Sequence, residues 1–299
     1  MKTKVFLGNG TLQSDTVTSF ALVSQSVRAY QLAYDGQPYH GFQRQPDVPT
    51  VEDTLFDALS ALDVLTDETT PPGYAGAGRT DSGVSALVQT ISFEAPDWLT
   101  PSAFNSELPG SIRVWASAEV PEEFHATHWA SEREYTYFLW AGDAEETLAR
   151  QTLEALSGEH DFHNLTPDDT GTVRTLDAVL EPEPPFFVIR VRAGGFPRQF
   201  VRRAVTLVSD IARGTRPLSF VDRVLSPETL SGPDGIGPAP APPLVLTGVS
   251  YPNIRFIVDQ EAARRSREQF GAMYRERATN ARLAEVLASS LGEFFDPAV

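Results

Sequence analysis

The stretch Gly76–Leu87, with the sequence GAGRTDSGVSAL, combines a flexible backbone with one arginine and one aspartate. Its three glycines allow the backbone to turn with positive φ or to approach a ligand closely. Their spacing lacks the last glycine of a dinucleotide-binding fingerprint, and no Gly-Lys-Ser/Thr of a phosphate-binding P-loop follows. What remains is the carboxylate of Asp81, two residues after the guanidinium of Arg79. A nearby cation favours the ionised form of a carboxylate even where water is excluded, and that form suits a nucleophile or a general base.

Two other interpretations of this loop stay open on chemistry alone. In the first, Asp81 caps a turn and pairs with Arg79, as exposed acid–arginine pairs commonly do. In the second, the chain is a phosphate-binding enzyme built on the glycine-rich loop. That enzyme would need a lysine or a set of metal ligands beside the loop, and the sequence offers neither there.

Composition limits the chemistry that is available to the chain. Its 299 residues include no cysteine, which excludes disulfides, thiolate nucleophiles and cysteine-ligated metals. Two His-x-x-His pairs, His125/His128 and His160/His163, have only scattered acids around them, so no metal site is predicted. No apolar run is long enough to span a membrane, and we expect a cytoplasmic protein with no membrane partner.

Charge is distributed unevenly along the chain. The net charge is −16 and the only lysines are Lys2 and Lys4, yet 41% of the residues are hydrophobic, which excludes a disordered acidic tail. We interpret this balance as adaptation to high salt, with ordinary acidic drift as the alternative. Residues 186–223 hold eight arginines against two acids, a net charge of +6. Arginine suits phosphate oxygens and base faces, so this segment predicts a site for an anionic partner, unless its arginines only neutralise neighbouring acids.

Hydrophobic periodicity predicts the elements that must position these residues. Alternation over Tyr30–Tyr34 predicts a strand, and Thr50 is a good N-cap for a helix with Leu55 and Leu59 on its apolar face. Further strands are predicted at 89–94, 134–140, 175–180 and 187–191, and helices at 147–156, 199–213 and 259–295. This mixed order favours an α+β fold with antiparallel sheet over a doubly wound parallel fold.

The elements recur in two halves that divide near Ser117, although no near-identical repeat is visible. We expect four segments along the chain: a flexible N-terminal extension (1–26), an N-terminal half that carries the Asp81 loop (27–117), a C-terminal half (118–252) and a helical tail (253–299).

The stretch AGAGRTDSGVSALVQTISFEA closely resembles the catalytic motif of the TruA family of tRNA pseudouridine synthases. Further segments match that family in order: YDGQPYHGFQRQPDVPTVEDTL (34–55), REYTYFLW (133–140), LSGEHDFHNL (156–165), FPRQFVRRAVTLVSDIARG (196–214) and LVLTGVSYP (244–252). The resemblance spans residues 27–252. It implies the pseudouridine synthase fold, in which two ferredoxin-like halves share a mainly antiparallel sheet with flanking helices and a central catalytic cleft.

The resemblance also implies roles for particular residues. Asp81 falls on the catalytic aspartate, Tyr135 on the tyrosine that covers the uracil ring, and Arg202 on the arginine that pairs with the carboxylate. The implied substrate-binding residues are Arg79, which helps to extrude the target base, Thr80, Gly83 and Leu246. Contacts to RNA phosphates are expected from Arg44, Arg198 and Arg203.

The implied activity is isomerisation of uridine to pseudouridine in the anticodon stem-loop of tRNA, at positions 38–40 or a subset of them. The family also implies a homodimer that needs no cofactor and no metal. Two positions depart from the family pattern. After Phe124-His125-Ala126, Thr127 and then His128 stand in place of the family's usual arginine, and in the 196–214 segment Phe200 replaces a methionine. The alternative function is a non-catalytic protein that binds structured RNA on the same scaffold.

High salt raises a question about how RNA would be held. Phosphate contacts weaken steeply as salt rises. We therefore expect more reliance on stacking and shape, with help from the tail arginines Arg264, Arg265 and Arg267.

Overall fold

The computed structural model describes residues 25–66 and 69–295, so the expected N-terminal extension lies almost wholly outside the described residues. The first half of the chain forms strands β1 (Gln25–Tyr34), β2 (Ala75–Gly76), β3 (Ser85–Pro96) and β4 (Ile112–Glu119), and helices α1 (Val51–Ala61) and α2 (Pro101–Phe104).

The second half forms strands β5 (Glu132–Trp140), β6 (Gly158–Asp161), β7 (Val173–Glu183), β8 (Phe186–Ala193) and β9 (Leu244–Ser250). Its helices are α3 (Glu146–Leu156), α4 (Phe200–Ala212) and α5 (Phe220–Val224), with short 3₁₀ turns at His163–Leu165 and Gly232–Asp234. Strand β10 (Ile257–Val258) and the long helix α6 (Gln260–Phe295) follow.

The two halves repeat one topology. In the first, the chain order β1-α1-β2-β3-α2-β4 gives the spatial strand order β4-β1-β3-β2. In the second, β5, β7, β8 and β9 take the matching spatial order β9-β5-β8-β7, with α3 and α4 as the crossovers. This is the ferredoxin-like arrangement twice over, so the predicted α+β fold is confirmed. Ser117, near which the sequence divides, lies in β4, and the chain crosses to the second half over residues 120–131.

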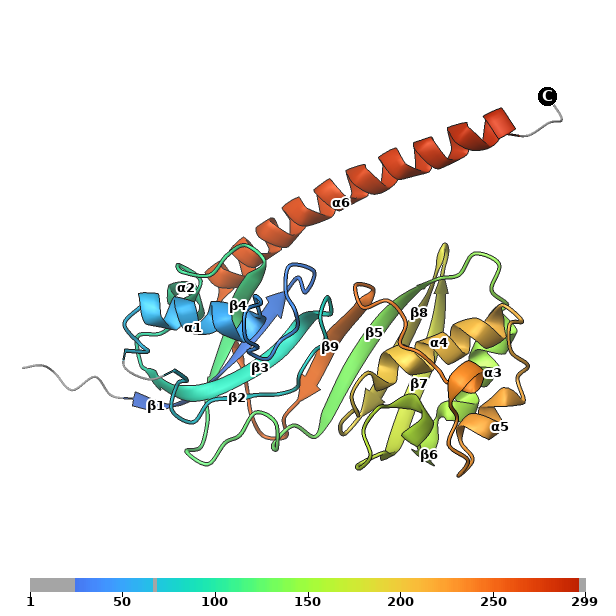
Figure 1. Ribbon diagram of the computed structural model, residues 1–299. Helices are drawn as coiled ribbons and strands as arrows, with labels where there is room; N and C mark the ends of the chain where they lie inside the picture. Colours follow the sequence, from blue (N-terminus) through green and yellow to red (C-terminus); the bar gives the residue numbers. More distant parts are fainter. Residues whose placement is uncertain (1–24, 67–68, 296–299) are drawn as a thin grey trace, which may run out of the picture.

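A single seam joins the halves into one sheet (Figure 1). At this seam β3 pairs with β9 in parallel, with Ser85 opposite Val245 and Ala86 opposite Leu246. Every other pairing between described strands is antiparallel. The seam places the start of β3, just after the Asp81 loop, one strand away from β5 of the other half.

Local sequence signals explain the helices nearest the seam. The Thr50 hydroxyl accepts a hydrogen bond from the backbone N–H of Asp53 at 3.2 Å and caps α1, whose apolar face is buried. Helix α4 buries Phe200, Val208 and Ile211 as its periodicity predicts. It stops before Gly214, which has a φ of +69°, a conformation that glycine adopts without strain.

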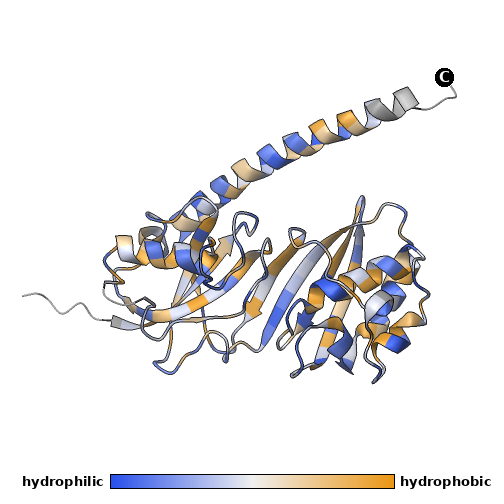
Figure 2. Cartoon of the chain, viewed as in Figure 1, coloured by the Kyte–Doolittle hydropathy of each residue, from blue (hydrophilic) through white to orange (hydrophobic). Residues whose placement is uncertain are grey.

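Helix α6 departs from the compact body. It begins beside β4 and then projects away from the sheet (Figure 1). Hydrophilic and hydrophobic residues are interspersed along its ribbon (Figure 2), and its exposed side chains include Leu283 and Leu287. Ala262 and Ser266 near its start are buried, whereas Tyr274 is 71% exposed. No helix in the described ranges is long and apolar enough to cross a membrane.

Candidate active site

The loop between β2 and β3 turns sharply at Asp81. The backbone N–H of Val84 donates to the Asp81 carbonyl at 3.1 Å, and Gly83 inside this turn has a φ of +83°. Residues other than glycine rarely adopt that backbone conformation, which accounts for the glycine at this position. The base of the loop is fixed to β3, because the Gln89 side chain donates to the Gly78 carbonyl at 2.8 Å.

Asp81 meets Arg202 across the seam. Nη1 of Arg202 donates to Oδ2 of Asp81 at 2.8 Å, while Nε of the same guanidinium donates to the Ala239 carbonyl at 2.7 Å. The Arg202 side chain is 15% exposed and that of Asp81 is 29% exposed. The partner of Asp81 is thus Arg202 from the first turn of α4, and not the neighbouring Arg79, as the turn-capping interpretation required.

Tyr135 comes to the same place from β5. It is buried, and its ring lies edge-on to that of Phe196, with 5.3 Å between the ring centroids. The pKa of the Tyr135 hydroxyl is raised to about 12, chiefly by burial and also by the Asp81 carboxylate, while the Arg133 guanidinium opposes the shift. The phenol therefore keeps its proton at neutral pH.

The backbone directly before α4 is strained, close to the pair formed by Asp81 and Arg202. Gln199 has a φ of +59°, an uncommon conformation for a residue with a side chain. It directly precedes the helical turn that presents Arg202. Strained backbone of this kind concentrates at sites where a side chain must be held in one position.

These residues line one cleft of about 1540 Å³ between the two halves. Of the predicted site residues, the cleft is lined by Asp81, Tyr135, Arg202, Arg79, Thr80, Arg44 and Arg198. Thr80 is nevertheless buried, and its hydroxyl is hydrogen-bonded to that of Tyr34 at 2.8 Å, so it fixes the loop.

Three predicted site residues are not among those that line the cleft. Gly83 serves the turn, and Leu246 is buried between Tyr135 and Ala86 on the neighbouring strands, while Leu244 lines the cleft instead. Arg203 donates to the Ile236 carbonyl at 2.6 Å, so it holds the loop that follows α5.

The arginines in the cleft differ in how they are held. Arg44 pairs with Asp53 at 2.7 Å, and Arg198 pairs with Asp168 at 3.3 Å. Arg79 is exposed and donates no hydrogen bond to any residue within 25–66 or 69–295.

Sequence reasoning missed the clamp formed by Arg133. Its guanidinium donates to four carbonyls, those of Ala77, Thr127, Ala130 and Gly194, at distances from 2.6 to 3.3 Å. It thereby ties the Asp81 loop to residues 120–131, which connect the two halves, and to the end of β8. A hydrogen bond to a distant carbonyl leaves no pattern in the neighbouring sequence. The only sequence feature that pointed to Arg133 was therefore the resemblance of its strand to the family's Arg-x-Tyr-x-Tyr strand.

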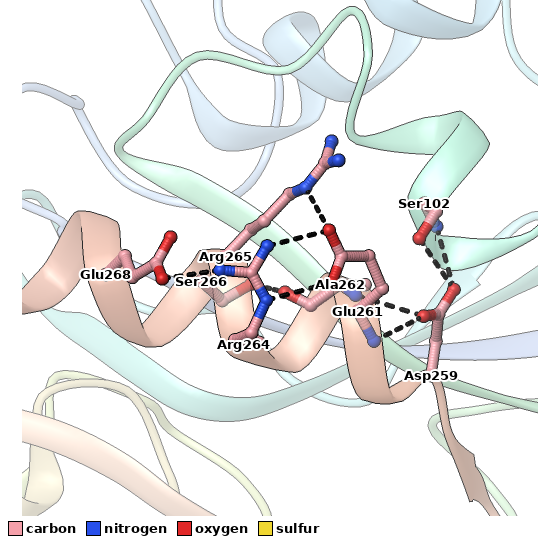
Figure 3. A network of polar contacts seen from close by, with 8 residues as sticks. All are labelled: Ser102, Asp259, Glu261, Ala262, Arg264, Arg265, Ser266 and Glu268. Carbon is pink, nitrogen blue, oxygen red and sulfur yellow. Dashed lines mark hydrogen bonds and ion pairs between the residues drawn. The ribbon is translucent and has the colours of Figure 1, made fainter.

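The tail arginines bond mainly to their own helix. Arg264 pairs with Glu261 at 2.8 Å and with Glu268 at 2.5 Å, and Arg265 pairs with Glu261 at 2.7 Å (Figure 3). RNA would have to compete with these acids for Arg264 and Arg265, whereas Arg267 is exposed and its expected phosphate contact stays a prediction. Within the described residues, no three His, Asp or Glu side chains lie close enough together to hold a metal ion.

Comparison with known proteins defines the class to which this fold and cleft belong. Residues 153–252 match the family model described as tRNA pseudouridine synthase. The chain is 54% identical to the tRNA pseudouridine synthase A of Natronomonas pharaonis over 88% of this chain and 99% of that protein. It is also 54% identical to the same enzyme of Haloarcula marismortui, over 89% of this chain and 100% of that protein, and 39% identical to that of Methanosarcina acetivorans, over 81% and 91%.

The chain belongs to the tRNA pseudouridine synthase A family and is an isomerase. Among solved structures, an archaeal box H/ACA sRNP Nop10–Cbf5 complex overlaps 61% of this chain and 43% of that chain at 14% identity, with a TM-score of 0.32. That likeness is too distant to carry any inference about the site.

Proposed function

We propose that this chain isomerises uridine to pseudouridine in the anticodon stem-loop of tRNA, with Asp81 as the catalytic carboxylate. The observation that carries the proposal is the pair of Asp81 and Arg202, 2.8 Å apart in a cleft that Tyr135 also lines. A charge-assisted hydrogen bond of this kind stabilises the negative charge of a carboxylate. The partial exposure of Asp81 leaves it accessible to a substrate.

Asp81 has an oxygen available for the chemistry. Pseudouridine formation breaks the N1–C1′ bond of uridine, turns the uracil, joins C5 to C1′, and moves the proton of C5 to nitrogen or solvent. A carboxylate supports three routes: attack on C1′, addition to C6 of the uracil, or removal of the C2′ proton to open a glycal. Oδ2 of Asp81 accepts from Arg202, while Oδ1 accepts no hydrogen bond from the described residues.

Tyr135 would hold the detached uracil. Its ring offers a face for stacking. Because the raised pKa keeps the hydroxyl protonated, Tyr135 donates a hydrogen bond to the base as it turns. A protonated hydroxyl cannot remove the C5 proton, so this step needs a stronger base than Tyr135. We assign it to the carboxylate of Asp81.

The target uridine must leave its stack to reach Asp81, which costs about a few kcal/mol. We assign to Arg79 the task of offsetting that cost, since it is exposed and lies two residues from Asp81. A guanidinium there can fill the vacated space and bind a phosphate. Arg44 and Arg198 would exchange Asp53 and Asp168 for phosphate oxygens.

We also propose that the enzyme acts as a cytoplasmic homodimer, as the family resemblance implies. The chain has a mass of 32.7 kDa. Sedimentation equilibrium in concentrated salt should give twice this mass, and the mass of a single chain at micromolar concentration would refute the dimer.

The substitution Asp81→Asn tests the catalytic assignment. We expect it to abolish tritium release from C5-labelled tRNA, while tRNA affinity changes little because the binding cations remain. Asp47→Asn is the matched control, since Asp47 is exposed outside the cleft. Near-normal tritium release by the Asp81 variant would refute the assignment. Normal binding of tRNA by a wild-type enzyme that releases no tritium would instead favour the non-catalytic alternative.

A further inference from the structure

Asp35 is a buried carboxylate at the end of β1, and its only partner cation among the described residues comes from the far end of the sequence. Its side chain is 8% exposed, and Oδ2 accepts from Nη2 of Arg277 in α6 at 2.6 Å. The other oxygen accepts the backbone N–H of Gln37 at 3.3 Å. Removing one partner of such a pair leaves an uncompensated buried charge, which is strongly unfavourable.

The segment that follows Asp35 lies directly against the Asp81 loop. A Cβ on Gly36 would lie 2.0 Å from the Val84 carbonyl oxygen, so the two backbones touch at this point. The Tyr39 carbonyl accepts the backbone N–H of Gly83 at 3.3 Å, and the Phe42 N–H donates to the Thr80 carbonyl at 3.1 Å.

These contacts bracket Asp81 on both sides. The loop that carries it is therefore shaped by the 35–42 segment. A displacement of that segment would break these contacts with the Asp81 loop.

Helix α6 brings Arg277 to Asp35. The start of this helix is held by the contacts of Asp259 that Figure 3 shows. The Asp259 carboxylate accepts the backbone N–H groups of Glu261 and Ala262 at 3.1 and 3.0 Å, and its other oxygen accepts the Ser102 hydroxyl at 2.8 Å. Arg277 lies about 27 Å further along the helix at 1.5 Å per residue. Its neighbours there are exposed, so the ion pair ties the projecting helix to the body.

We propose that Arg277 is a positioning residue for the isomerisation, acting through Asp35 and Gly36 on the loop that holds Asp81. Its guanidinium neutralises Asp35 and keeps the 35–42 segment pressed against residues 80–84. Without it, Asp35 turns toward water, Gly36 leaves Val84, and the Asp81–Arg202 geometry loosens. This inference rests on the proposed catalytic role of Asp81.

Single-turnover kinetics on C5-tritiated tRNA, with tRNA affinity measured in parallel, test the proposal. Misplacing a catalytic group by about an ångström costs up to roughly 100-fold in rate, so we expect Arg277→Gln to lower the single-turnover rate roughly tenfold. Its tRNA Kd should stay within about twofold, because positioning acts on the reacting groups. Arg277→Lys, which keeps a positive charge, should recover most of the rate.

Arg282→Gln is the matched control, because Arg282 lies on the same exposed helix and, among the described residues, pairs only with Glu285, at 2.8 Å. It should react at the wild-type rate. The variant Asp35→Asn/Arg277→Gln should be no slower than Asp35→Asn alone, since the neutral amide needs no cation. If Arg277→Gln alone does not fold, this double variant, compared with Asp35→Asn, takes its place as the test.

Several outcomes would overturn the proposal. A wild-type rate for Arg277→Gln, with or without a lower melting temperature, shows that the ion pair only attaches the helix. Additive losses for Asp35→Asn and Arg277→Gln, or a loss confined to tRNA Kd, exclude action through Asp35. Asp81→Asn belongs in the same assay: if it still reacts, the proposed function has failed, whereas an inactive Asp81→Asn beside a fully active Arg277→Gln refutes only the positioning role.

Discussion

The guanidinium of Arg202 bonds at once to Oδ2 of Asp81, at 2.8 Å, and to the Ala239 carbonyl, at 2.7 Å. One side chain thus joins the start of α4, the loop before β9 and the Asp81 loop of the other half. Lysine cannot make both bonds with the same geometry, because it has one ammonium in place of the planar fork. This double use explains an arginine at this position better than charge alone does.

We predict that Arg202→Lys slows tRNA isomerisation by roughly 30-fold, about 2 kcal/mol, which is the usual contribution of a hydrogen bond to a charged group. Arg202→Ala should be slower still. Single-turnover tritium release measures both rates. Arg203→Ala provides the control, since Arg203 bonds the Ile236 carbonyl and is absent from the cleft lining. It should lower the melting temperature and leave rate and tRNA affinity unchanged; a weaker affinity would restore the phosphate contact expected from the sequence.

The site shows how far local sequence could lead. Chemistry alone singled out Asp81, yet it offered Arg79 as the nearest cation, because only neighbours in sequence are visible in a loop. The true partner, Arg202, lies 121 positions away. It was predicted only through the resemblance of whole segments. Arg277 lies 242 positions from Asp35, beyond the matched segments, and nothing in the sequence pointed to this pair.

The fold was predictable to a similar degree. Helices α1 and α4 follow from caps and apolar periodicity, which act within a few residues. Strand β4 was missed although its residues, IRVWASAE, alternate between apolar and polar types except at Trp115, and their burial alternates in the same way. The parallel seam of β3 and β9 joins residues about 160 positions apart, and strand pairing over that distance leaves no periodic signal.

Gly36→Ala should disrupt the contact between the 35–42 segment and the Asp81 loop. The new Cβ would lie 2.0 Å from the Val84 carbonyl oxygen, so one backbone must move. We predict a loss of about 3 kcal/mol in the free energy of unfolding, measured by urea denaturation, together with a large loss of activity. Gly237→Ala is the control, because apart from its chain neighbours no atom of the described residues lies within 4 Å of its Cβ position. Equal stability of the two variants would contradict the tight contact.

The protein should lose stability in alkali partly through Tyr135. In the folded state its pKa rises to about 12 from 10.0, chiefly through burial and also through the Asp81 charge. The folded protein therefore keeps a proton that the unfolded chain loses, so this contribution is complete below pH 10.0 and declines as the pH rises toward 12. Tyr135→Phe should show a shallower fall in the free energy of unfolding across that window. An identical slope in both proteins would mean that Tyr135 is not buried as a neutral phenol.

The start of α6 should depend on the ionised form of Asp259. Burial by itself would raise the pKa of Asp259, but hydrogen bonds from Ala262, Ser102 and Glu261 outweigh it and hold the pKa below its ordinary value of 3.8. The stabilisation is therefore complete above that value and is lost as the pH falls through the lower pKa of the folded state. Asp259→Ala should cost about 1 kcal/mol at neutral pH, the usual effect of losing an N-cap, and less at low pH. Thermal melts followed by circular dichroism at neutral and acidic pH measure both values. Ser102→Ala, which removes only the hydroxyl donor, should give a smaller loss of stability with the same direction of pH dependence. If the cost of Asp259→Ala does not shrink in acid, the charge of the carboxylate contributes nothing to the cap.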